Sequence, residues 1–177
     1  MAHPMAQFRF CPKCGSPHFA ENDNKSKRCS DCGFVLYDNA AAAVACFVVR
    51  GNELLLCKRA KNPAQGMLDL PGGFADHGES AEEALAREVY EELNLRITAA
   101  HYLFSLPNVY TYSGFDVHTL DLFYLVEVAD CGPLRCADDV ASARFYDIAS
   151  IDTHQIGLAS VRKAVEKFIS ESLYKLI

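Results

Sequence analysis

Alternating apolar runs and polar turns divide most of the chain into expected strands and helices. A nearly continuous apolar run at residues 40–50 predicts a buried strand, and Gly51-Asn52 predicts a tight turn. Residues 53–59 then predict the partner strand of a hairpin, and residues 60–73 are expected to form a loop. The other expected strands cover residues 95–106, 117–128 and 143–146.

Two segments carry apolar residues at helical spacing. Residues 80–94 predict a helix that starts near Glu79 or Ser80 and ends at Asn94, a plausible left-handed cap. Its expected buried face consists of Ala81, Leu85, Val89 and Leu93. Residues 158–176 predict a second helix. Strands on both sides of a central helix, with another helix at the end, indicate an α/β sandwich.

The first part of the chain carries two Cys-x-x-Cys pairs, each followed by a glycine. The four cysteines are Cys11, Cys14, Cys29 and Cys32. Four thiolates at this spacing predict a closed, structural Zn²⁺ site in which no position is open for catalysis, with two redox pairs or two disulfides as the alternatives. His18 lies between the pairs and is expected to be an ordinary surface residue. We expect a zinc ribbon at residues 1–37 and a second domain at residues 38–177.

Composition and charge narrow the classes of function. The chain has 177 residues and a net charge of −6, which gives no support to a general nucleic-acid binder. Local basic residues in the ribbon keep a weak nucleic-acid role open. No apolar run is long enough for a transmembrane helix, and the N-terminus lacks a secretory segment, so we expect a cytoplasmic protein.

The expected helix at residues 80–94, which follows the glycines Gly72-Gly73, is rich in glutamate and carries the second candidate site. At 100° per residue, Glu88, Glu91 and Glu92 fall within about a third of the helix circumference. Three carboxylates so close together repel one another, and a hard cation such as Mg²⁺ or Mn²⁺ resolves that repulsion. The alternative is a solvated acidic helix face. The glycines favour the metal site, because they allow close approach of the backbone to a ligand.

This stretch resembles the Nudix box, G-x5-E-x7-R-E-U-x-E-E-x-G-U with U an aliphatic residue. The chain reads Gly73-x5-Glu79-x7-Arg87-Glu88-Val89-x-Glu91-Glu92-x-Asn94-Leu95, and Asn94 is the one departure. The resemblance implies a Nudix-type α/β/α sandwich with a mixed sheet. It also implies hydrolysis of the pyrophosphate bond of a nucleoside diphosphate linked to another moiety.

The resemblance further implies roles for individual residues. Glu88, Glu91, Glu92 and the Gly72 carbonyl would bind the catalytic Mg²⁺ or Mn²⁺. The residues expected to take part in catalysis are Glu79, Arg87, Glu91 and Glu92. Glu79 would support the loop and Arg87 would orient the carboxylates. The general base varies in the family, and Asp138 or Asp139 is the candidate here.

A zinc ribbon before a Nudix domain is similar to the NADH pyrophosphatase branch. That branch carries S-Q-P-W-P-F-P-x-S after the box, where this chain keeps Ser105, Pro107 and Ser113 but loses the tryptophan and two prolines. We therefore expect a shorter relative with an altered specificity motif. Tyr110 and Tyr112 are candidates for stacking on a base, with ordinary strand aromatics as the alternative.

Three functions remain in view at this point. The favoured one is a hydrolase of NADH, ADP-ribose or a similar nucleotide. The second is a sensor that binds such a nucleotide without cleaving it, and the third is a hydrolase of capped RNA ends. Nudix relatives are often homodimers, but no interface can be identified from the sequence.

Overall fold

A computed structural model of the chain describes residues 3–112, 114–129 and 133–176, with the side chains of Tyr110 and Tyr112 outside the description. The chain divides into two compact units, Met1–Ala40 and Ala41–Ile177. No helix in the described part of the chain is long and apolar enough to cross a membrane.

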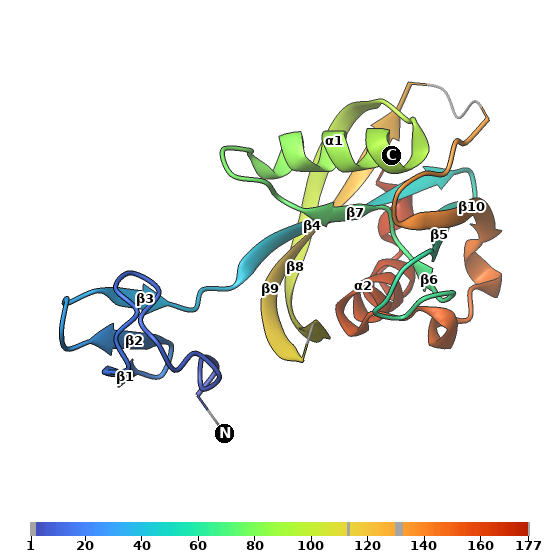
Figure 1. Ribbon diagram of the computed structural model, residues 1–177. Coiled ribbons are helices and arrows are strands. Elements are labelled where there is room, and N and C mark those ends of the chain that lie inside the picture. The colour runs from blue at the N-terminus through green and yellow to red at the C-terminus, as the bar shows by residue number, and fades with distance from the viewer. Residues whose placement is uncertain (1–2, 113, 130–132, 177) are drawn as a thin grey trace. The chain divides into compact units, whose positions relative to one another are not determined.

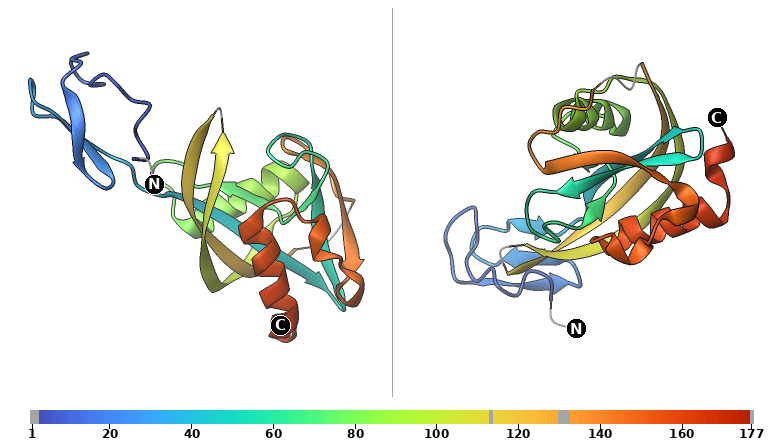
Figure 2. Two further views of the ribbon diagram at one scale, coloured as in Figure 1. Left: turned by 90° about the horizontal axis from the view of Figure 1, so that it is seen from below. Right: turned by 90° about the vertical axis from the view of Figure 1, so that its right-hand side faces the viewer.

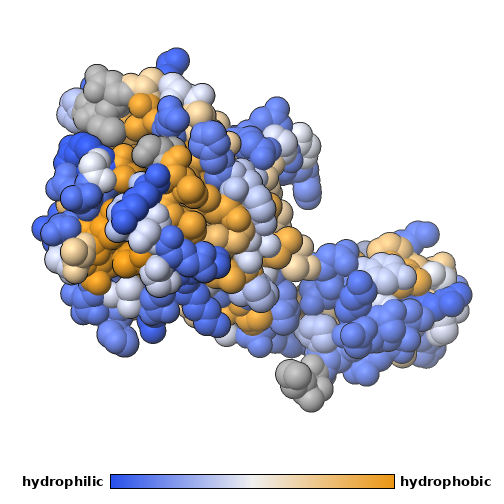
Figure 3. Space-filling view, turned by 180° about the vertical axis from the view of Figure 1, so that it is seen from behind, coloured by the Kyte–Doolittle hydropathy of each residue, from blue (hydrophilic) through white to orange (hydrophobic). Residues whose placement is uncertain are grey.

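The first unit is a small three-stranded antiparallel sheet. Its strands are β1 (Phe19–Asp23), β2 (Ser26–Cys29) and β3 (Val35–Tyr37). The buried apolar residues of this unit are few, with Cys11, Phe19 and Cys29 forming one cluster. The surface of the unit is mostly hydrophilic (Figure 3). So small a core makes a bound metal a natural source of folding free energy.

The second unit is built on a mixed sheet. Its path runs β10-β5-β4-β9-β8, with β6 added beside β5 and β7 beside β4. Strands β4 and β9 pair in parallel, with Ala41 opposite Thr119, while the other named pairs are antiparallel. The strands are β4 (Ala41–Arg50), β5 (Glu53–Arg59), β6 (Leu68–Asp69), β7 (Gly72–Phe74), β8 (Ile97–Tyr112), β9 (Phe115–Val128) and β10 (Val140–Asp147).

Two helices cover opposite faces of this sheet (Figures 1 and 2). Helix α1 (Ala81–Leu93) packs on the face that carries Val44, Cys46 and Val48, and α2 (Ala159–Ser170) packs on the other. On the α2 side, the rings of Phe47 and Phe168 stack with centroids 3.9 Å apart. The expected α/β/α sandwich with a mixed sheet is therefore confirmed.

Several predicted boundaries were wrong. Residues 60–73 are not a plain loop, because β6 and β7 lie within them and pair with β5 and β4. Strand β8 continues past Leu106 to Tyr112, since it pairs with β9 along its whole length. Helix α2 ends at Ser170, and Ser172 then takes a left-handed conformation before a 3-10 turn. That turn is η3 (Leu173–Lys175), and two further 3-10 turns in the described residues are η1 (Ile148–Ser150) and η2 (Thr153–Gln155).

Candidate functional site

Two adjacent glycines in β7 bring the backbone against strand β4 and helix α1. Gly72 has a φ of +144°, and a Cβ at this position would lie 2.1 Å from the carbonyl oxygen of Val44. A Cβ at Gly73 would lie 2.5 Å from the carboxylate of Glu88. No larger residue fits at Gly72 without moving backbone, and one at Gly73 displaces the glutamate.

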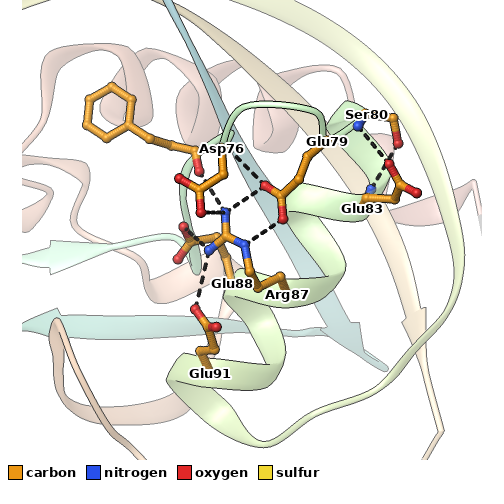
Figure 4. Close-up of polar contacts among 8 residues, drawn as sticks. Asp76, Glu79, Ser80, Glu83, Arg87, Glu88 and Glu91 are labelled. Atoms are coloured by element: carbon orange, nitrogen blue, oxygen red, sulfur yellow. Dashed lines mark hydrogen bonds and ion pairs between the residues drawn. The ribbon is translucent and has the colours of Figure 1, made fainter.

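Local signals fix both ends of α1. The Ser80 side chain accepts a hydrogen bond from the backbone N–H of Glu83, and the Glu83 carboxylate accepts one from the N–H of Ser80 (Figure 4). This reciprocal pair is a capping box. At the other end Asn94 is left-handed, with φ 56°, and its N–H donates to the carbonyl of Tyr90. The expectation that asparagine replaces the glycine cap is confirmed.

Arg87 joins the glycine loop to the carboxylate helix (Figure 4). Its Nε and Nη2 donate to the two carboxylate oxygens of Glu79 at 2.7 and 2.9 Å. Its Nη1 donates to Glu88 at 2.8 Å and to Glu91 at 3.3 Å, and its Nη2 also donates to the carbonyl of Phe74 at 3.0 Å. A planar guanidinium suits such a set of acceptors, and it restrains the rotamers of all three glutamates.

The electrostatic environment differs between these glutamates. The paired hydrogen bonds from Arg87, together with the backbone N–H of Asp76, lower the pKa of Glu79 to about 2. Glu79 is therefore a fixed anion and a poor proton acceptor near neutral pH. Burial raises the pKa of Glu88, against the opposing effect of Arg87.

Glu92 is the most deeply placed carboxylate of the box. The residue is 6% exposed, and one oxygen accepts a hydrogen bond from the Gly72 N–H at 3.0 Å. Burial raises its pKa to about 8, and the charges of Glu88, Asp69 and Asp139 act in the same direction. A buried carboxylate among other carboxylates is the environment that a divalent cation relieves.

The three expected metal ligands therefore occupy different settings around the glycine turn. Glu92 contacts the Gly72 backbone and Glu88 lies against Gly73, whereas the Glu91 side chain is 52% exposed. Within the described residues, the set of three or more potential ligands that lies within 4.8 Å consists of the four cysteines alone. The glutamates thus lie around one turn without converging on a point.

A cavity of about 500 Å³ opens beside Gly72 and Gly73 on the α2 side of the sheet. Its lining is mainly apolar, from β4, β9 and the start of α2, a composition typical of small-molecule sites. The buried Asp121 also lines it, and its carboxylate accepts hydrogen bonds from the hydroxyls of Thr119 and Ser160, both at 2.5 Å.

A buried ion pair lies between this cavity and Glu92. Arg59 donates to Asp69 at 2.5 Å, and both residues also line a small cavity of about 30 Å³ that reaches Glu92. Sequence reasoning did not find Arg59, Asp69 or Asp121. The sequence offers one signal for Asp121, an acidic residue inside an otherwise apolar run.

The two candidate general bases sit at the mouth of this region. Lys61 pairs with Asp138 at 2.9 Å and with Asp139 at 2.5 Å. Asp139 lines both cavities, whereas Asp138 lines neither, and Asp138 has a left-handed φ of 49°. The geometry therefore favours Asp139 over Asp138 as a residue that can reach a bound substrate.

The four N-terminal cysteines form a compact cluster. The Sγ atoms of Cys11 and Cys32 are 3.7 Å apart, as are those of Cys14 and Cys29, and all four lie within 4.8 Å of one another. Tetrahedral Zn²⁺ with Zn–S bonds of about 2.3 Å requires S···S distances of about 3.8 Å, so the donor set fits zinc. His18 lies outside the cluster and pairs with Asp31 on the surface.

Gly15 and Gly33 allow the two turns that carry these cysteines. Their φ angles are 75° and 72°, in the left-handed region expected for a glycine after each pair. Each glycine N–H donates to the carbonyl of the first cysteine of its pair.

The backbone of Tyr110 and Tyr112 lies in β8, opposite Val117 and Phe115 of β9. Both side chains fall outside the described residues, so their role in stacking on a base stays a prediction.

The fold and the site together define a class of protein. It is an α/β sandwich in which a glycine turn, a helix rich in glutamate and a cavity of small-molecule size lie next to one another. The chain belongs to the NUDIX domain family, whose model matches residues 39–168. The resemblance noted in the sequence is thereby confirmed.

Three similar proteins show how far the likeness extends. The chain is 28% identical over 169 residues to the NAD-capped RNA hydrolase NudC of Stutzerimonas stutzeri (strain A1501), covering 96% of this chain and 59% of that protein. It is 36% identical over 118 residues to the ADP-ribose pyrophosphatase of Methanocaldococcus jannaschii, covering 66% and 67%. A crystal structure of a NUDIX hydrolase from Nitrosomonas europaea shares the fold, with a TM-score of 0.69, 22% identity and coverage of 94% and 93%.

Proposed function

We propose that this protein is a metal-dependent pyrophosphohydrolase that cleaves a nucleoside diphosphate linked to another moiety, such as NADH or ADP-ribose. One observation supports it above the others. Glu88 and Glu92 contact the backbone of Gly72-Gly73, and these glycines also line the 500 Å³ cavity. A diphosphate at this turn would leave its nucleoside side facing an apolar pocket.

Each residue of the site has a definite task in this proposal. Glu88, Glu91, Glu92 and the Gly72 carbonyl would hold Mg²⁺ or Mn²⁺. A bound divalent cation supplies charge neutralisation and lowers the pKa of a water nucleophile. Arg87 holds the glutamate rotamers, and Asp139 is the candidate that accepts the proton from water as it attacks phosphorus.

Pyrophosphate hydrolysis at this site requires a rigid loop between Gly73 and Glu79. The attacking water and the leaving phosphate need a fixed arrangement, and a small displacement of the supporting groups is costly in rate. Glu79 contributes by accepting two hydrogen bonds from Arg87 and one from the N–H of Asp76, which ties the loop to α1.

The first unit is proposed to hold one structural Zn²⁺ through its four cysteines. A homodimer and a cytoplasmic location remain predictions, and sedimentation analysis measures the first of them.

The activity is tested by incubating the protein with NADH, ADP-ribose, dinucleoside polyphosphates and nucleoside triphosphates, with Mg²⁺ or Mn²⁺. We expect release of a mononucleotide from NADH or ADP-ribose. Glu91→Gln should lower kcat by at least about 100-fold, because a charged group at the reacting phosphates is lost. Glu127→Gln, an exposed glutamate on β9, is the matched control and should keep wild-type turnover.

Three results would redirect the proposal. Tight binding of ADP-ribose without turnover would favour the sensor. Normal turnover by Glu91→Gln would remove that glutamate from the metal site. Preference for capped RNA over free NADH would favour the third function, and the names of the NudC relatives give that function specific support.

A further inference from the structure

The cavity beside the glycine turn holds a buried carboxylate that the proposed hydrolysis does not use. Asp121 of β9 is 7% exposed and lines this cavity next to Thr119 and Phe123. Carboxylates are seldom buried unless a group of opposite charge pairs with them. In the part of the chain that the structure describes, no lysine, arginine or histidine forms an ion pair with Asp121. Asp121 therefore brings a strong hydrogen-bond acceptor, without a paired cation, to a mainly apolar wall.

Strand pairing explains why there is space in front of this carboxylate. Along β9, Thr119, Asp121 and Phe123 alternate on the face of the sheet that packs against α2. Asp121 is opposite Ala43 of β4, and Phe123 is opposite Ala45. Both alanines also line the cavity. Because their side chains are short, they leave open a volume that larger residues would fill, and a ligand can approach the carboxylate through it.

Two hydroxyl groups next to Asp121 fix the polarity of this wall. The hydroxyls of Thr119 and Ser160 each donate to one oxygen of the carboxylate, both at 2.5 Å. A hydroxyl has one proton to donate, and each of these uses it in the hydrogen bond to Asp121. The Thr119 oxygen, which also belongs to the cavity wall, therefore offers a ligand only its lone pairs, and the carboxylate oxygens keep further acceptor capacity. Asp121 and Thr119 together present acceptors and no side-chain donor.

The two other carboxylates on the wall of this cavity have different surroundings. Asp69 pairs with an arginine and Asp139 with a lysine, both at 2.5 Å. Both also line the smaller cavity that reaches Glu92, whereas Asp121 lines only the larger of these two cavities. Asp121 thus belongs to the part of the site that would hold the nucleoside side of the substrate and not its reacting phosphates.

We propose that Asp121 determines substrate specificity by accepting a hydrogen bond from an NH2 group carried by a planar ring of the substrate. This inference rests on the proposed function and narrows its substrate class to diphosphates whose buried ring carries such a group. An NH2 group has two N–H bonds, one for the Asp121 carboxylate and one for the Thr119 oxygen. A ring with a carbonyl or a methyl group in that place leaves the buried acceptors without a partner, which disfavours its binding.

Two analogues of NADH each remove one candidate NH2 group without changing the charge of the molecule. Reduced nicotinamide hypoxanthine dinucleotide has a carbonyl in place of the adenine NH2 group, and reduced 3-acetylpyridine adenine dinucleotide has a methyl group in place of the carboxamide NH2 group. We expect kcat/KM to be at least about tenfold lower for one of these analogues than for NADH, and that analogue identifies the ring that contacts Asp121. Equal kcat/KM values for NADH and both analogues would overturn the inference.

The variant Asp121→Asn assigns this preference to the carboxylate. Asparagine keeps the shape of the side chain and replaces one acceptor oxygen by an N–H donor, which can serve the carbonyl group of either analogue. The preference for NADH should therefore fall from at least about tenfold to within about twofold. Asp116→Asn is the matched control, since Asp116 is exposed on the same strand and also accepts a hydrogen bond from a threonine hydroxyl, at 2.8 Å. A wild-type preference in Asp121→Asn, or an equal loss in Asp116→Asn, would overturn the inference.

A second variant distinguishes recognition of the ring from a structural role of Asp121. Ser160→Ala removes the hydroxyl that α2 donates to Asp121 and leaves the carboxylate and Thr119 in the cavity wall. If Asp121 contacts the ring, the preference for NADH persists in Ser160→Ala and disappears in Asp121→Asn, even where urea unfolding shows that both variants have lost stability. An equal fall of the preference in both variants would show that Asp121 only anchors α2, and the inference would be wrong.

Binding measured without turnover separates this inference from the proposed function. In calorimetric titrations without added Mg²⁺ or Mn²⁺, wild type should bind NADH at least about tenfold more tightly than one of the two analogues, and Asp121→Asn should bind them within about twofold. If this difference is found while NADH and ADP-ribose are not hydrolysed, the proposed hydrolysis fails and the role of Asp121 stands. If hydrolysis is found without the difference, the role of Asp121 fails alone. Absence of both binding and turnover would overturn both.

Discussion

Replacing Glu92 by glutamine should stabilise the metal-free protein at alkaline pH. Glutamine has nearly the same shape, and its carbonyl oxygen can still accept the hydrogen bond from the Gly72 N–H, which is 3.0 Å from the carboxylate. What it lacks is a charge. In the wild type, burial raises the pKa of Glu92 from 4.5 to about 8, with Glu88, Asp69 and Asp139 adding to the effect. Ionising this residue is therefore easier in the unfolded chain than in the fold.

The sign and size follow from proton linkage. Below about pH 4.5 the carboxyl is neutral in both states and has no effect on stability. Between about pH 4.5 and 8 the folded state binds the extra proton, so stability is lost as the pH rises. At 1.36 kcal/mol per pKa unit, the total is about 3–5 kcal/mol.

The assay is urea unfolding followed by circular dichroism, since the chain has no tryptophan. Without added Mg²⁺ or Mn²⁺, Glu92→Gln and wild type should agree within about 1 kcal/mol near pH 5, and the variant should be about 3–5 kcal/mol more stable near pH 9. Added Mg²⁺ should stabilise the wild type more than the variant. Glu91→Gln, with its side chain 52% exposed, is the control and should shift stability by less than about 1 kcal/mol. An identical pH dependence in wild type and Glu92→Gln would refute the reasoning.

Two further predictions concern the glycine turn and the cysteine cluster. Gly73→Ala places a methyl group 2.5 Å from the Glu88 carboxylate, so kcat for NADH should fall about 100-fold while circular dichroism stays unchanged; unaltered turnover would contradict the placement of Glu88. Cys14→Ser should reduce zinc, measured by atomic emission, from about one ion per chain to well below one, because a three-thiolate site binds more weakly. Wild-type zinc content in that variant would exclude the four-cysteine site.

Features fixed by neighbouring residues were predictable from the sequence. The start and end of α1 depend on Ser80 with Glu83 and on Asn94, all within one turn of the helix ends. The turns of the four-cysteine cluster likewise depend on cysteines and glycines that are adjacent in sequence. In these places local preference and the fold agree, which is why the pattern alone was sufficient.

Features that depend on distant partners were not predictable. Strands β4 and β5 pair with each other only near their turn, and β6 and β7 pair with parts of β5 and β4 away from it. Residues 60–73 contain no local signal for these distant partners. Asp121 is satisfied by Ser160, which lies 39 residues further along the chain. Glu92 is buried because it packs against the Gly72 backbone and the sheet. A helical wheel can place Glu92 near Glu88, but it cannot show that Glu92 is the more deeply buried of the two.

The parallel pairing of β4 with β9 has a consequence for synthesis of the protein. Ala41 pairs with Thr119, so 78 residues must follow the start of β4 before its partner exists. At about 5–20 residues per second, a ribosome needs about 4–16 s for that stretch. During this time β4 can pair with β5 and β7, and α1 can cover one of its faces, but its edge toward β9 and the face that packs against α2 stay uncovered. We expect nascent chains arrested before residue 115 to bind a chaperone that recognises exposed apolar strands, and chains arrested after the whole of β9 has emerged to release it.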